Sequence, residues 1–123
     1  MLFLSNPALK YAISMCISEP RYAVFIAPAD QDARLHVIDY IRTNIRNQNC
    51  DVAMSGTGFG VWFENGSYIK VIRPNPETRG LTAHLVIADE NLNRETMNHV
   101  QSCERQFWRR YNELHHDDDW LPF

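Results

Sequence analysis

The chain has 123 residues, of which 45% are apolar and 22% are charged, and this predicts a single globular domain (residues 1–123) with a buried core. Its net charge of −3 and its pI of about 5.9 argue against a dedicated nucleic-acid binder, which would carry a basic surface. No uncharged apolar run is long enough to span a membrane, and the N-terminal Met-Leu-Phe-Leu lacks the basic flank and cleavage site of a signal peptide.

The first predicted elements along the chain are a strand, a helix and a second strand. Met1–Leu4 is a short apolar run that we expect to form a buried strand. Ser5 offers a cap for the helix that follows, and Pro20 stops that helix. Tyr22–Ala27 is a compact apolar run, which is typical of a central strand covered by helices on both faces.

A second helix is predicted after Asp30, which can cap it. Its inner stripe should consist of apolar residues at helical spacing, namely Leu35, Ile38, Ile41 and Ile45. Its outer face should consist of charged residues, namely Arg34, Asp39, Arg42 and Arg46. We expect this helix to fray through residues 47–49, and the glycines within residues 56–60 predict a loop.

The next segment carries the signal of a β-hairpin. Val61–Glu64 and Ser67–Ile72 are rich in β-forming residues, and they flank Asn65 and Gly66. An Asn-Gly pair in this place favours a primed turn, because both residues accept positive φ. Pro74 should end the second strand of the hairpin.

The last part of the chain predicts a strand and a long helix. His84–Ala88 is again apolar on both faces, and residues 93–114 follow the pattern of an amphipathic helix. Residues 115–123 form an acidic and aromatic tail that either folds back over an exposed part of the sheet or docks into a partner. Buried strands that alternate with helices and a hairpin predict an α/β fold, with a single layered domain and a mixed sheet.

Two acidic residues, Asp89 and Glu90, directly follow the last predicted strand. In P-loop proteins that hydrolyse nucleotides, a strand delivers an Asp that helps to hold magnesium and a Glu that orients the attacking water. Ligands of open α/β sheets bind beyond the carboxyl ends of the strands, where these carboxylates should lie. The alternative explanation is a strand that leads into the acidic first turn of a helix.

The order of these motifs resembles the ATPase domain of phage terminase large subunits and, more loosely, the first half of helicase-like ATPases. In that family a strand ending in an Ala-Pro-Thr-like turn precedes a long helix, and residues 23–33 have this pattern. An Asn-Gly-Ser hairpin, an Arg-Gly pair and the Walker B strand then follow, as Asn65–Ser67, Arg79–Gly80 and His84–Glu90 do here. The resemblance covers roughly residues 5–92. It implies a truncated P-loop ATPase core with Asp89 at the magnesium position and Glu90 at the catalytic position.

The chain departs from this family at the phosphate-binding loop. It contains no Gly-Lys-Ser or Gly-Lys-Thr, and Lys10 lies inside the first predicted helix. Backbone N–H groups and a lysine are needed to cradle the phosphates of ATP. We therefore expect no complete catalytic constellation and no cofactor, with Mg-ATP bound only if a partner supplies the phosphate loop.

Three other groups of residues have a chemical and a structural interpretation. Arg105, Arg109 and Arg110 lie near Trp108 and Tyr111, which would suit nucleic acid by charge and stacking, although the same aromatic positions form a helical core stripe. The histidines and aspartates of residues 115–119 have metal-ligand types without the spacing of a site. The three cysteines form no CxxC pair, so we expect thiols in a reducing compartment.

From the resemblance and the missing loop we favour a non-catalytic, phage-derived accessory or inhibitor protein that binds a protein partner. Its candidate anchors are Trp108, Trp120 and Phe123. One alternative is a split or truncated fragment of a viral DNA-packaging terminase. Another alternative is a protein that binds a nucleotide or a nucleic acid. The negative net charge of the chain does not favour nucleic acid. We expect no membrane partner and a cytoplasmic location, in the host cell if the protein is viral.

Overall fold

The computed structural model describes residues 1–55, 58–73 and 82–114, and for residues 105–114 it describes the helical backbone alone. The elements in chain order are β1 (Leu2–Phe3), α1 (Asn6–Ser18), β2 (Ala23–Ala27), α2 (Gln31–Asn44), β3 (Cys50–Ser55), β4 (Gly58–Phe63), β5 (Tyr68–Val71), β6 (Leu85–Ala88) and α3 (Arg94–Leu114). Among the helices in these ranges, none has both the length and the apolar character needed to cross a membrane.

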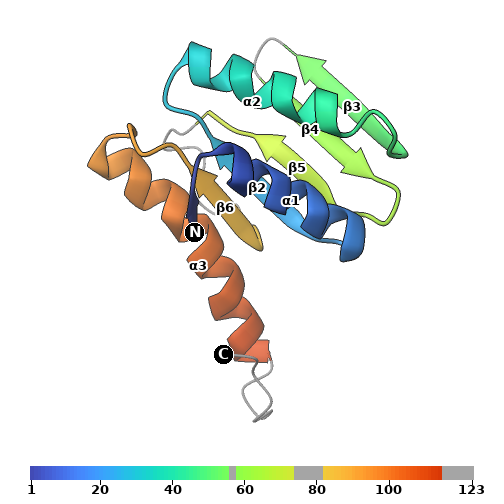
Figure 1. The fold of residues 1–123 in the computed structure, drawn as a ribbon. Coiled ribbons are helices and arrows are strands. Elements are labelled where there is room, and N and C mark those ends of the chain that lie inside the picture. The colour runs from blue at the N-terminus through green and yellow to red at the C-terminus, as the bar shows by residue number, and fades with distance from the viewer. Residues whose placement is uncertain (56–57, 74–81, 115–123) are drawn as a thin grey trace.

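The strands form one sheet with the order β1-β6-β2-β5-β4-β3 (Figure 1). Strands β1, β6, β2 and β5 run parallel to one another, so their carboxyl ends meet at one edge of the sheet. Strand β4 is antiparallel to β5, and β3 is antiparallel to β4. The protein is therefore an α/β domain with a mixed sheet, as the sequence predicts.

Helices pack on both faces of the sheet and give the domain three layers. Val24 and Ile26 of β2 point into a core cluster shared with α1 and α2. Ala23, Phe25 and Ala27 of the same strand point into a second cluster shared with α3. Every residue of β2 and of β6 is buried. The prediction that these two segments are strands covered on both faces is confirmed.

The predicted helix starts are also confirmed. Ser5 Oγ accepts a hydrogen bond from the backbone N–H of Ala8 at 3.2 Å, and Pro7 lies in the first turn of α1. Asp30 Oδ1 accepts from the N–H of Ala33 at 2.8 Å and so caps α2. These caps take up N–H groups that have no partner within a helix.

The predicted faces of α2 are wrong at two neighbouring positions. Arg34 is only 7% exposed, whereas Leu35 is 54% exposed. The buried residues of this helix follow the spacing Arg34, Val37, Ile38 and Ile41. Arg34 is thus the first member of the buried stripe of α2. Leu35, the next residue along the helix, therefore points to solvent. The apolar pattern alone assigned the arginine to the outside.

The N-terminal strand is shorter and less buried than predicted. Strand β1 consists of Leu2 and Phe3, and both side chains are exposed. It lies at the edge of the sheet and pairs only with β6. An edge strand has one neighbour, so an apolar sequence there does not ensure burial.

Strand β3 was missed in the sequence, and the loop predicted for residues 56–60 is wrong where the structure describes it. Gly58 and Gly60 lie in β4, which pairs with β3 along its whole length. A Cβ atom on Gly60 would come within 2.6 Å of the Trp62 ring, so the indole lies directly over this glycine. Glycine serves here as a flat surface for an aromatic side chain and not as a breaker of the strand.

The predicted hairpin is present, with a different turn. Gly66 has φ of 88°, and Arg21 is the one non-glycine residue with positive φ in the described ranges, so the positive φ predicted for Asn65 is wrong. The N–H of Gly66 donates to the Phe63 carbonyl, and the N–H of Phe63 donates to the Ser67 carbonyl. These bonds close a three-residue loop in which a glycine alone needs the left-handed conformation.

Asn65 ties this turn to the end of α1. Its Nδ2 donates to the carbonyls of Cys16 at 2.8 Å and Glu19 at 3.1 Å, and its Oδ1 accepts from the N–H of Ser67 at 3.0 Å. The hydroxyl of Ser67 donates to the same Glu19 carbonyl at 2.6 Å and accepts from the N–H of Tyr22 at 2.9 Å. The hairpin thus pairs with carbonyl groups that the helix leaves unpaired.

We predict that Asn65→Ala lowers the free energy of unfolding by about 1–3 kcal/mol, because it removes the donor to the partly buried Cys16 carbonyl together with the bonds to Glu19 and Ser67. Asn49→Ala is the matched control, since it removes one exposed hydrogen bond to Glu64 at 3.0 Å. We expect the control to cost less than about 1 kcal/mol. Urea unfolding of both variants measures the difference, and equal losses would show that the link between hairpin and helix adds no specific stability.

Candidate functional site

Asp89 lies at the carboxyl end of β6 and is buried. Its Oδ2 accepts a hydrogen bond from the N–H of Ala29 at 3.0 Å, and its Oδ1 accepts from the N–H of Asn91 at 3.0 Å. The carboxylate therefore joins the end of β6 to the loop that follows β2. Both of its oxygens are occupied by backbone N–H groups, which is a structural use of a carboxylate.

The surroundings of Asp89 supply little of what a magnesium site needs. Glu90 is the next residue, and its side chain is exposed. Within the described ranges no group of three or more His, Cys, Asp or Glu side chains could hold a metal ion. Magnesium asks for near-octahedral oxygen ligands. Asp89, with both oxygens already bonded, does not provide them alone.

The connection between β1 and α1 stands where the terminase resemblance would place the phosphate loop. It consists of Leu4 and Ser5. The N–H of Leu4 donates to the Ala88 carbonyl, and the hydroxyl oxygen of Ser5 accepts a hydrogen bond from the N–H of Ala8. Pro7 has no N–H to offer. A phosphate cradle needs several free backbone N–H groups in a longer loop, so this helix start is not one.

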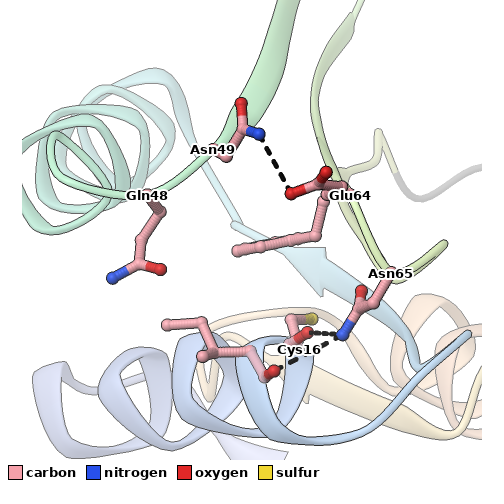
Figure 2. Close-up of a pocket in the computed structure, with 7 residues that line it drawn as sticks. Cys16, Gln48, Asn49, Glu64 and Asn65 are labelled. Atoms are coloured by element: carbon pink, nitrogen blue, oxygen red, sulfur yellow. Dashed lines mark hydrogen bonds between the residues drawn. The ribbon is translucent and has the colours of Figure 1, made fainter.

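A cavity of about 340 Å³ opens at the opposite end of α1 (Figure 2). It lies between the end of that helix, the segment before β3 and the β4–β5 turn. Its lining consists of Cys16, Ile17, Gln48, Asn49, Phe63, Glu64 and Asn65. Figure 2 shows Asn65 bonded to the helix end on one side and Asn49 bonded to Glu64 on the other.

The polar groups of this cavity are unsuited to nucleophilic catalysis. Burial raises the pKa of the Cys16 thiol to about 12, so it stays protonated at neutral pH. Its Sγ lies 3.9 Å from the carbonyl oxygen of Tyr22 and 3.8 Å from that of Tyr68. Asn65 is engaged by the helix end, and the Glu64 carboxylate accepts from Asn49. The cavity is therefore built by structural contacts.

The open edge of the sheet at β3 is the surface that sequence reasoning missed. Val52 is 44% exposed and Met54 is 57% exposed, although their partners on β4, Val61 and Phe59, are buried. The Arg42 guanidinium lies 5.8 Å from the centre of the Phe59 ring. We call β3 with its exposed Val52 and Met54 the β3 edge. Alternating apolar and other residues in Cys50–Ser55 were the signal for it.

The predicted partner anchors cannot be placed at a site. Trp120 and Phe123 lie outside the described residues, as does the whole tail of residues 115–123. Trp108 falls within α3, in the part for which the backbone alone is described. The Arg79–Gly80 pair of the terminase resemblance also lies outside the described ranges.

No protein-family model, no curated protein and no solved structure matches this chain. The likeness to the terminase ATPase thus stays a prediction from the sequence.

We predict that a thiol reagent at pH 8 modifies Cys50 in the native protein and spares Cys16 and Cys103. Burial raises the pKa of all three thiols, but Cys16 and Cys103 are buried whereas Cys50 is partly exposed, so the reagent can reach Cys50. N-ethylmaleimide labelling followed by mass spectrometry of peptides reads this out, with a urea-unfolded sample as the control in which all three react. Rapid native labelling of Cys16 would contradict the site description.

Proposed function

We propose that the chain is a non-catalytic domain that binds a protein partner through the β3 edge. Following the terminase resemblance, we propose that it is a phage-derived accessory or inhibitor protein on a remnant of that ATPase fold, acting in the host cytoplasm. The observation that carries the binding proposal is the exposed apolar β3 edge. The engaged carboxylate of Asp89 and the protonated thiol of Cys16 support the absence of catalysis.

The two edges of the sheet differ in how they are protected. Strand β1 has two residues, and such a short edge offers few N–H and C=O groups to another chain. Strand β3 has six residues and a single charged one, Asp51. Natural edge strands are usually blunted by shortness, charges, proline or bulges. The β3 edge has little of this protection, which favours its pairing with another strand.

An extended segment of a partner protein is the occupant that suits this edge. Its backbone would add a strand beside β3, and its apolar side chains would pack on Val52 and Met54. Arg42 Nη2 lies 3.9 Å from the Met54 sulfur, so a positive charge flanks the apolar pair. We therefore expect the partner segment to combine apolar residues with a nearby carboxylate.

We predict that the double variant Val52→Lys/Met54→Lys weakens partner binding at least tenfold, which corresponds to about 1.4 kcal/mol. Two lysines on an edge strand repel an incoming apolar strand and keep their charges in water. The partner is first captured from host lysate with the wild-type chain, and its affinity is then measured by calorimetry. Since both side chains are already exposed, we expect the melting temperature to change little.

Leu35→Lys provides the matched control for this experiment. Leu35 is an apolar residue of comparable exposure that lies on α2 instead of the edge. The control should bind the partner as the wild type does. Equal binding by the edge variant would overturn the proposed surface. Light scattering measures whether the chain also forms dimers as its concentration rises. Dimers that depend on the β3 edge would mean that a second copy of the chain, and not a different protein, occupies this surface.

We predict that the chain does not hydrolyse ATP in the presence of magnesium, because the described residues provide no phosphate cradle before α1. A phosphate-release assay measures this, with and without DNA. Turnover that Asp89→Ala abolishes would instead favour the alternative of a terminase fragment. In that case Asp89 would have to release the N–H groups of Ala29 and Asn91 to hold a metal ion.

A further inference from the structure

Arg34 is a buried cation with an unsatisfied donor. Its side chain leaves the first turns of α2, and the residue is only 7% exposed. Its Nη1 has no hydrogen-bond acceptor among the residues that the structure describes. Buried donors without a partner are rare in folded proteins, and they destabilise the fold, more so when the group is charged. An arginine so placed requires an explanation other than packing.

A cavity of about 240 Å³ adjoins this guanidinium. It lies where α2 begins and where β2 and β5 end, and Pro28, Ala29 and Ile72 contribute to its walls. The carboxyl ends of parallel strands are the usual place for ligands in α/β sheets. The cavity is smaller than the pockets that take drug-sized molecules, which suits a single small group.

Two arginines place positive charge at this cavity, and its lining also includes Asp30. Arg73, which follows β5, lines it together with Arg34, and the two are close enough that the charge of Arg73, after burial, lowers the pKa of Arg34. Arginine nevertheless stays protonated in proteins. The beginning of α2 adds the N–H groups of its first turn and the positive end of the helix dipole.

Two carboxylates lie at the same end of the sheet, and each is bonded to backbone. Asp30 caps α2 through the N–H of Ala33, and Asp89 holds the loop at Ala29. In the described parts of the chain neither of them forms an ion pair with Arg34. The Arg34 guanidinium is therefore not paired with either of these carboxylates.

We propose that this cavity binds a phosphate-type oxyanion. Arg34 and the first turn of α2 supply the donors, and Arg73 adds positive charge to the lining at the end of β5. A phosphate group, with its larger charge and several free oxygens, suits a guanidinium beside a helix start better than a carboxylate does. The site is separate from the β3 edge, so it goes beyond the partner-binding function and does not depend on it.

The test is a titration of the full chain with sodium phosphate, followed by nuclear magnetic resonance of backbone amides at constant ionic strength. We expect saturable shifts of the Gln31 and Asp32 amides in the first turn of α2. Acetate, added to the same concentration, should give much smaller shifts there. Glycerol phosphate forms a third arm: tighter binding than that of inorganic phosphate would indicate the phosphate group of a larger molecule, and equal binding would indicate the free ion.

Variants at Arg34 decide whether the guanidinium is responsible. Arg34→Met keeps the apolar stem and should weaken phosphate binding at least tenfold, while Arg34→Lys should retain part of it. Arg46→Met is the matched control, because it removes an exposed arginine beyond the end of α2 and should bind as the wild type does. The proposal is overturned if phosphate and acetate shift the amides alike or if the α2 amides do not shift. It is also overturned if Arg34→Met and Arg46→Met lose phosphate binding equally. The wild-type titration remains decisive even if Arg34→Met does not fold.

Discussion

Strand β2 has no face that can remain in water, and the rest of the fold is arranged around this constraint. Val24 and Ile26 point to one side and Phe25 to the other, and all are buried. Helices therefore have to cover both faces of the sheet, which the alternation of strands and helices along the chain achieves. The cover is uneven, because α1 and α2 pack on one face while α3 packs near β6 and β2 on the other. Strand β3 lies beyond β4 at the end of the described sheet and has no strand on its outer side, so it is an open edge.

The elements with local signals could be predicted from the sequence, and those that depend on distant contacts could not. Ser5 and Asp30 cap their helices through atoms three residues away, so the caps are readable in the chain itself. Strand β3 becomes a strand by pairing with β4, and the glycine at position 60 is accommodated because Trp62 covers it. A glycine that predicts a loop from the local sequence therefore lies in a strand here, where it contacts an aromatic side chain. The turn at Asn65 was found for its sequence, but its bonds to the end of α1 span 46 to 49 residues.

The same distinction explains what the sequence revealed about the candidate sites. Asp89 was identified from its place after an apolar strand, yet the N–H group that occupies one of its oxygens comes from Ala29, 60 residues away. Helical periodicity placed Arg34 on the outer face, because a charged residue on an amphipathic helix normally points to water. The fold buries Arg34 beside the cavity at the ends of β2 and β5, and no local pattern reveals these distant neighbours. Chemistry-bearing residue types were visible, whereas their partners depended on the fold.

The buried guanidinium and the open edge are both unfavourable for an isolated domain, and this is the strongest reason to regard them as binding features. Methionine at position 34 would fill the same space without an unpaired charged donor, so packing does not account for arginine there. Lysines in place of Val52 and Met54 would protect the β3 edge without touching the core, since both residues are already exposed. Small domains are stable by only about 5–15 kcal/mol, so features that cost a few kcal/mol are significant. A ligand that accepts hydrogen bonds from the guanidinium would remove the loss of stability caused by the unpaired donor. A strand that pairs with β3 would likewise cover the open edge. The two features lie on different parts of the same sheet.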